Sequence, residues 1–191
     1  MQDFKAIKAA LSSRRPLRSG DAGAGEASVA LILAPGMQAL FIKRAKQEKD
    51  PWSGQVGLPG GHKEPQDADL LHTALRETWE ETGIRLAPQD LLGELADLRP
   101  DWQGLPSLNI RPFVFGITGR PRLKTNAEVQ SAFWVGLDSL QGSEKRIRTR
   151  KGLVRVPVYK AGRHVIWGIT RRILAAFLAE ITPSRSQAPS A

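Results

Sequence analysis

Three glutamates gather near the end of a segment with helical periodicity, and this segment constrains the fold more than any other. Residues 67–82 have the helical pattern, and Gly83 follows in the position where many helices end. An α-helix turns about 100° per residue, so Glu81 lies about 40° to one side of Glu77, and Glu80 about 60° to the other. The three carboxylates therefore share one face of the predicted helix.

The opposite face of this helix is apolar. Ala68, Leu71 and Leu75 fall between about 120° and 180° from Glu77, so we expect that face to pack on a sheet. Three carboxylates on the other face repel one another, and like charges at i,i+4 do not favour a helix. A hard divalent cation such as Mg²⁺ or Mn²⁺, which prefers oxygen ligands, would offset that repulsion. The alternative is an acidic face that simply meets solvent.

Residues beside the glutamates favour a metal site over a solvated face. Arg76 precedes Glu77 and can hold a carboxylate in a fixed orientation through two parallel hydrogen bonds. Gly60 and Gly61 follow Pro59, and without Cβ atoms they let the backbone approach the same site, where a carbonyl can bind metal. A tight turn is the alternative role for this Pro-Gly-Gly.

The segment from Gly61 to Ile84 resembles the Nudix box, G-x5-E-x7-R-E-U-x-E-E-x-G-U, in which U is usually aliphatic. The residues that match are Gly61, Arg76, Glu77, Glu80, Glu81, Gly83 and Ile84, with Thr78 at the first U. The middle of the segment departs from the pattern, because Asp67 replaces the first glutamate and eight residues rather than seven separate it from Arg76. In the family that glutamate mainly supports the loop and the helix, so the change leaves the metal-binding face intact.

The resemblance implies both a fold and an activity. Nudix proteins are similar to one another in an α/β/α sandwich around a mixed β-sheet, and in hydrolysing the pyrophosphate of a nucleoside diphosphate linked to another group. We therefore expect an α/β fold and an enzyme that uses Mg²⁺ or Mn²⁺. The residues implied in metal binding are Glu77, Glu80, Glu81 and Gly61, and those implied in catalysis are Arg76 and the same three glutamates. One of these carboxylates also serves as the base, unless a later one such as Glu128 does.

The run before the box, LFIKRAKQEKDPWSGQVGLPGG, resembles the motif of the coenzyme A-directed branch, roughly LLTxR(S/A)x3Rx3Gx3FPGG. It has one extra residue, Lys49 in place of an arginine and Leu58 in place of phenylalanine. The resemblance predicts that coenzyme A or a derivative is cut into 3′,5′-ADP and 4′-phosphopantetheine. Basic side chains can bind the phosphates and Trp52 can stack on adenine, so the predicted substrate-binding residues are Arg44, Lys49, Trp52 and Gly60. The alternatives are ADP-ribose or another nucleoside-diphosphate derivative, and a nucleotide- or RNA-binding module without turnover.

Outside this segment, periodicity predicts further strands and helices. Helices are expected at 3–12 and 165–181, and strands at 27–34, 38–44, 92–98, 108–118, 132–135 and 153–159, the first two as a hairpin. We divide the chain into an N-terminal helix and loop (1–25), a Nudix hydrolase domain (26–182) and a disordered tail (183–191).

The 191-residue chain is basic, with a formal charge of +9. This charge favours polyanionic partners, either nucleic acid or phosphate-rich small molecules. The intact Arg76, Glu77, Glu80 and Glu81 oppose a pure nucleic-acid binder, so we expect a small nucleotide substrate and not nucleic acid. Eight basic residues and one acid lie between Ser143 and Arg163, either in a solvated, mobile loop or in a phosphate-binding surface. Without cysteine or an apolar run of about 18 residues, the sequence predicts a cytoplasmic protein with no membrane contact. Homodimers are common in the family, although no surface in the sequence identifies an interface.

Overall fold

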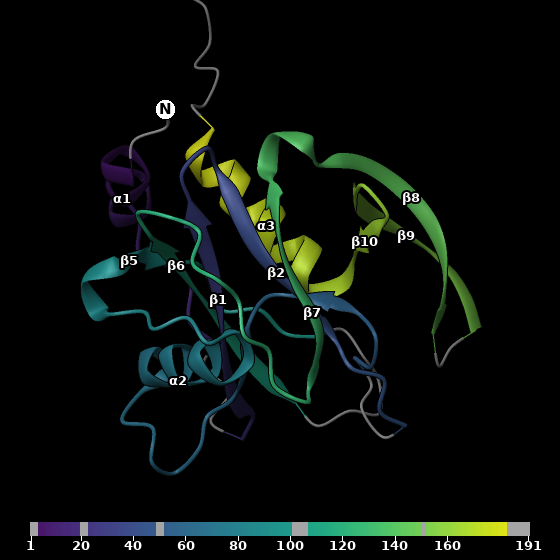
Figure 1. Cartoon of the computed structure of the whole chain (residues 1–191), viewed down its shortest axis with the longest axis horizontal. Helices are drawn as coiled ribbons and strands as arrows, with labels where there is room; N and C mark the ends of the chain where they lie inside the picture. Colours follow the sequence, from purple (N-terminus) through teal and green to yellow (C-terminus); the bar gives the residue numbers. More distant parts are fainter. Residues whose placement is uncertain (1–3, 20–22, 49–51, 101–106, 150–151, 183–191) are drawn as a thin grey trace, which may run out of the picture.

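The computed structural model describes residues 4–19, 23–48, 52–100, 107–149 and 152–182. These residues form one large sheet, one small sheet and three α-helices (Figure 1). The helices are α1 (Phe4–Ser12), α2 (Leu70–Thr82) and α3 (Gly168–Ile181), and none of them is long and apolar enough to cross a membrane. Lys49 and the predicted tail, residues 183–191, lie outside the described ranges.

The large sheet has seven strands in mixed orientation. They are β1 (Gly25–Ala34), β2 (Gln38–Arg44), β3 (Val56–Gly57), β4 (Gly60–His62), β5 (Leu91–Glu94), β6 (Leu108–Gly116) and β7 (Val129–Gly136). In the centre, β1 pairs with β6 in parallel on one side and with β2 and β4 antiparallel on the other. Antiparallel pairs of β2 with β3 and β7, and of β5 with β6, complete the sheet. The predicted hairpin of β1 and β2 is confirmed.

The central strand β1 is buried on both faces, and its side chains alternate between two hydrophobic cores. Ala30 and Ile32 pack with residues of α2 in one core. Leu31 and Leu33 pack with residues of α1 and α3 in the other. One helix therefore covers one face of the mixed sheet and two helices cover the opposite face, which confirms the predicted α/β/α sandwich.

The boundaries of α2 follow from its two caps. Asp69 has an extended backbone, and its carboxylate accepts a hydrogen bond of 2.8 Å from the N–H of His72. This cap makes the helix begin at Leu70, three residues later than predicted. At the other end Gly83 is left-handed, with a φ of 72°, and its N–H donates to the carbonyl of Trp79. The predicted end of the helix is thus confirmed.

The described part of the basic segment 143–163 forms a β-ribbon and not a loop. In the small sheet, β8 (Gln141–Thr149) and β9 (Gly152–Ala161) pair along their length, and β10 (His164–Ile166) pairs with the end of β9. Residues 150–151, between the two long strands, lie outside the described ranges. Because residues 164–166 belong to β10, α3 begins at Gly168 and not at 165 as predicted.

Replacement of Phe177 by alanine tests the packing of α3. Phe177 is fully buried in the core that α3 shares with β1, so Phe177→Ala is expected to lower the free energy of unfolding by about 3–5 kcal/mol. Chemical denaturation measures this change. The control is Leu17→Ala, because Leu17 is 80% exposed and its replacement should cost no more than about 0.5 kcal/mol. Equal effects of the two changes would contradict the packing.

Candidate active site

Two adjacent glycines bring the backbone of β4 against α2. The N–H of Gly60 donates to the carboxylate of Glu81 at 2.9 Å. Gly60 has a φ of 150°, and a Cβ atom there would overlap the carbonyl oxygen of Ser28. A Cβ atom on Gly61 would collide with the carboxylate of Glu77. Position 60 therefore requires glycine, and a side chain at position 61 would displace the carboxylate of Glu77. The close approach of backbone to carboxylates that the sequence predicts is present.

The inward direction of Glu77 and Glu81 follows from helix geometry. The contact of α2 with the sheet is centred on Leu70 and Ala74. Glu77 and Glu81 each lie seven residues further along, which is about two helical turns, so they share the face of these two apolar residues. The prediction of an acidic face opposite the apolar one is therefore wrong for this pair. Of the residues predicted to form the apolar face, Leu71 and Leu75 are only partly buried, and Ala68 precedes the helix.

Burial raises the pKa of both inward glutamates. Glu81 is only 1% exposed. Loss of solvent raises the pKa of Glu81 to about 8, against the opposing effect of the Gly60 hydrogen bond, and the charges of Glu77 and Glu128 act in the same direction as burial. Burial also raises the pKa of Glu77. The site thus holds two carboxylates in surroundings that disfavour their negative charge.

Arg76 connects α2 to the loop before it. Its guanidinium donates to both carboxylate oxygens of Asp67, at 3.0 and 2.9 Å, in the bidentate arrangement predicted for this arginine. It also donates to Glu77 at 2.9 Å and to the carbonyl of His62 at 3.1 Å. Arg76 thereby fixes the orientation of Glu77 relative to the loop that leaves β4.

Glu80 is the outermost of the three glutamates. Its side chain is 48% exposed and accepts a hydrogen bond of 3.2 Å from Arg76. Within the described ranges, no three Asp, Glu or His side chains form a group that could hold a metal ion. The structure therefore brings Glu77 and Glu81 together in the interior, while Arg76 holds Glu80 on the outside.

Two predicted residues far from α2 in the sequence reach the same site. Arg44 ends β2, and its guanidinium lies 3.7 Å from the carboxylate of Glu81. Glu128 immediately precedes β7, and its carbonyl accepts a hydrogen bond of 2.8 Å from the N–H of Ala45. The charge of Glu128 contributes to the raised pKa of both Glu77 and Glu81. The pairing of β2 with β7 is what brings these two segments to the acids of α2.

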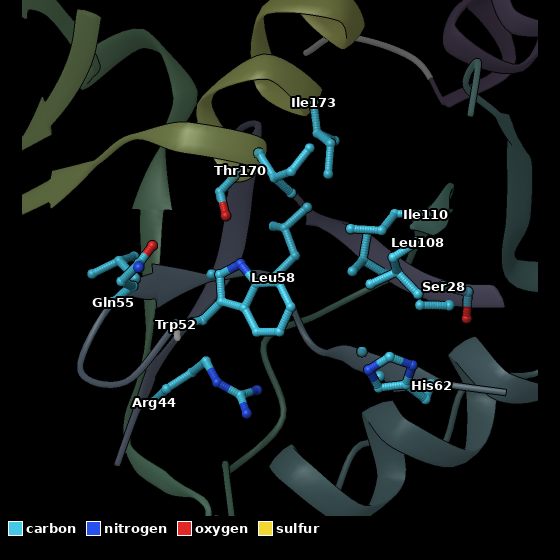
Figure 2. Close-up of a pocket in the computed structure, with 17 residues that line it drawn as sticks. Ser28, Arg44, Trp52, Gln55, Leu58, His62, Leu108, Ile110, Thr170 and Ile173 are labelled. Atoms are coloured by element: carbon cyan, nitrogen blue, oxygen red, sulfur yellow. The ribbon is translucent and has the colours of Figure 1, made fainter. Parts of the chain in front are cut away.

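A cavity of about 290 Å³ opens beside β4. Its walls come from β1, β3, β4, β6 and α3 and are mainly apolar. Figure 2 shows Trp52 and Arg44 on one side of the cavity and Thr170 and Ile173 of α3 on another. Three of the four predicted substrate-binding residues, Arg44, Trp52 and Gly60, line this space. The carboxylates of α2 and a space for a small molecule thus meet at the two glycines.

Comparison with known families shows which family this chain belongs to. The NUDIX domain profile matches residues 24–155. The chain belongs to the Nudix family. It is therefore a Nudix hydrolase, and hydrolysis of a pyrophosphate is its reaction class. The matched region ends within β9 and leaves α1 and α3 outside.

Individual relatives agree with this assignment. The chain is 32% identical over 176 residues to the mouse protein named mitochondrial coenzyme A diphosphatase NUDT8, covering 87% of this chain and 81% of that protein. It is 31% identical over 165 residues to the uncharacterized Nudix hydrolase NudL of Photorhabdus laumondii, covering 83% and 86%. A solved structure of a MutT/nudix family protein from Enterococcus faecalis matches with a TM-score of 0.59 at 17% identity, over 88% of this chain and 65% of that one, and so supports the fold alone.

Asp67 occupies the place of the first glutamate in the Nudix box. Besides Arg76, its carboxylate accepts hydrogen bonds from the hydroxyl of Thr73 at 3.0 Å and from the N–H of Glu64 at 2.9 Å. The hydrogen bonds to Asp67, above all from Arg76, hold the pKa of this carboxyl well below its usual range. The extra residue between Asp67 and Arg76 therefore does not prevent the two side chains from forming a bidentate ion pair.

The sequence pattern misses one wall of the cavity. Ile169, Thr170 and Ile173 of α3 line the space, together with Leu108 and Ile110 of β6. These residues look like ordinary core positions, because apolar periodicity shows which residues are buried but not what they face. No signal in the sequence identifies them as part of the site.

The pair of Asp67 and Arg76 is expected to contribute strongly to stability. Asp67→Asn keeps the shape of the side chain but removes the charge that faces a largely buried guanidinium, so we expect the free energy of unfolding to fall by about 3 kcal/mol. The control, Asp138→Asn, changes an exposed aspartate and should alter it by about 0.5 kcal/mol or less. Urea denaturation at neutral pH distinguishes the two outcomes.

The same pair predicts a pH dependence. Because the pKa of Asp67 is lower in the folded chain than its unfolded value of 3.8, its stabilisation is present above that value and is lost as the pH falls. The stability difference between the wild type and Asp67→Asn should therefore shrink below about pH 4. Denaturation at a series of pH values measures this difference, and a constant difference down to pH 3 would exclude the charge of Asp67 as its cause.

Proposed function

We propose that this Nudix hydrolase cuts the pyrophosphate of coenzyme A or a derivative, releasing 3′,5′-ADP and 4′-phosphopantetheine. The observation that carries the proposal is the 32% identity, over 87% of the chain, to a protein named a coenzyme A diphosphatase. The site supports it, because the cavity beside Gly60 offers a mainly apolar space for a small molecule next to the acids of α2.

The donor groups fit a hard divalent cation, Mg²⁺ or Mn²⁺. Glu77 and Glu81 are inward carboxylates whose pKa values are raised chiefly by burial, and oxygen ligands are those that such cations prefer. We propose Glu77, Glu81 and the carbonyl of Gly61 as ligands. Glu80, which Arg76 holds on the outside in this structure, would have to turn inward to join them. When bound, the cation would neutralise diphosphate oxygens and lower the pKa of a water molecule.

The reaction breaks one P–O bond of the diphosphate bridge. The oxygen of the attacking water goes to one phosphorus, and the bridging oxygen leaves with the other phosphate. One of the three glutamates of α2 accepts the proton from this water, with Glu128 as the alternative base. Arg76 keeps the carboxylate of Glu77 oriented, and the N–H of Gly60 does the same for Glu81.

Substrate recognition falls to residues on the cavity side of the glycines. We propose that Arg44 binds a phosphate and that Trp52 stacks on the adenine, since both line the cavity. Lys49 follows Arg44 by five residues in the sequence and would supply positive charge for the 3′-phosphate. At Gly60, the absence of a Cβ atom would let the diphosphate approach the backbone.

Product analysis tests the substrate. The full chain with Mg²⁺ or Mn²⁺ should convert coenzyme A into 3′,5′-ADP and 4′-phosphopantetheine, both resolved by chromatography, and a chelator should abolish the reaction. Faster hydrolysis of ADP-ribose than of coenzyme A would reassign the substrate. Absence of turnover on a panel of nucleotides, together with tight, salt-sensitive RNA binding, would favour a non-catalytic module.

Substitution of single carboxylates tests the assignment of the acids. Glu81→Gln is expected to lower kcat by about 10²–10⁴-fold, since an amide neither accepts the proton nor binds metal comparably. Glu180→Gln, on α3 and outside the site, is the control for loss of a carboxylate and should leave kcat unaltered. A similar loss in Glu128→Gln would identify that residue as the base. Wild-type turnover by Glu81→Gln would show that the role given to α2 is wrong.

A further inference from the structure

The ribbon of β8 and β9 carries a surface that the proposed function does not use. Among the described elements, β8 packs extensively only against β9, whereas β9 is also held by α3 and β10. Val158 and Ala161 are buried, so the base of the ribbon belongs to the body of the protein. Its distal part curves away from the large sheet (Figure 1).

The two faces of the ribbon differ in chemistry. Residues directly opposite each other in an antiparallel pair project from the same face. Arg146 is opposite Arg155, and Arg148 is opposite Leu153, so these four residues share one face, the arginine face. The other face carries the pairs Lys145–Val156, Ile147–Val154 and Ser143–Val158.

Both faces of the distal ribbon meet solvent, but the arginine face is the more exposed, because Ile147 and Val156 on the opposite face are partly buried and Val154 is 38% exposed. Arg146, Arg148 and Arg155 are exposed, and Leu153 is 62% exposed. Towards the base of the ribbon the opposite face turns into the core, because Val158 is 1% exposed. An exposed leucine among three arginines forms a surface that is both cationic and apolar.

The charges of the arginine face are largely uncompensated. Arg155 forms an ion pair of 2.7 Å with Glu144, the sole acidic residue in β8 and β9. Neither Arg146 nor Arg148 has an acidic partner within the part of the chain that the structure describes. This surface therefore lacks an anion of its own and is complementary to one supplied from outside.

We propose that the arginine face docks on the surface of an anionic lipid bilayer, with Leu153 inserted at the level of the headgroups. Arginine binds phosphate through paired hydrogen bonds, and each basic residue near an anionic leaflet strengthens binding about fivefold. The exposed Leu153 favours a bilayer over nucleic acid, because an aliphatic side chain gains by leaving water for the lipid interface. Single-stranded nucleic acid is instead bound by stacking on aromatic side chains, which the distal arginine face lacks.

Sedimentation with vesicles tests this docking. The full chain should bind vesicles of phosphatidylcholine mixed with phosphatidylglycerol and should be released from them as salt is added. It should not bind vesicles of pure phosphatidylcholine. Arg146→Gln/Arg148→Gln is expected to weaken binding about 30-fold, from two basic residues. The matched control, Arg120→Gln/Arg122→Gln, removes the same charge from exposed positions outside the ribbon and should weaken binding far less.

A second pair of variants isolates the apolar contribution. Leu153→Ser should weaken vesicle binding about tenfold by removing the inserted side chain, while Leu17→Ser, at a position 80% exposed, should not. All these side chains are exposed, so thermal unfolding of each variant should match that of the wild type and show that the fold is kept.

Four results would overturn the proposal. They are absence of binding to anionic vesicles, equal losses in the two double arginine variants, an unaltered affinity of Leu153→Ser, and loss of RNA binding in Arg146→Gln/Arg148→Gln while vesicle binding is kept. The last result would assign the arginine face to nucleic acid.

Discussion

The hydrogen bond from the N–H of Gly60 to Glu81 joins the parts of this protein on which the site depends. Gly60 lies in β4, which pairs with the central strand β1, and Glu81 lies in the last turn of α2. The contact forms because two glycines let β4 lie close to β1 on one side and to the carboxylate of Glu77 on the other. If β4 lay further away, Glu81 would be a buried acid without this hydrogen-bond donor. The cavity that Gly60 lines would then no longer lie next to the acids of α2.

Placing acids in the interior is costly, and the surrounding residues compensate for only part of the cost. Arg76 neutralises Glu77 from one side, and Arg44 lies 3.7 Å from Glu81 on the other. Asp67 in turn holds Arg76, so that this arginine is fixed from the loop and not only from the helix. Burial raises the pKa of Glu81 although Gly60 and Arg44 both favour its charged form, and a divalent cation has the chemistry to favour that form further.

The features of the site that depend on neighbours in the sequence could be predicted, and those that depend on packing could not. The end of α2 at Gly83 and the close approach at Gly60 follow from spacing and from residue type. Of the three glutamates that spacing places on one face, Glu77 and Glu81 come together, while Glu80 is held outside by Arg76. The inward turn of two glutamates could not be read from the helical wheel, because the wheel shows which residues share a face but not which face meets the sheet. The strand predicted at 153–159 lies within β9, but no pattern predicts its partner β8, whose mainly polar and basic residues lack a clear apolar alternation and which is stabilised mainly by pairing with β9.

Helix α3 contributes to the shape of the cavity but carries none of the acids of the site. The region shared with the family ends at residue 155, yet Ile169, Thr170 and Ile173 of α3 form a wall of the cavity. The acids, the glycines and most of the cavity walls stand inside this region, so only the wall formed by α3 is encoded outside it. Changes in α3 can therefore alter which molecules fit without disturbing the groups that would act on them, and relatives that agree in the Nudix box can differ in what they admit.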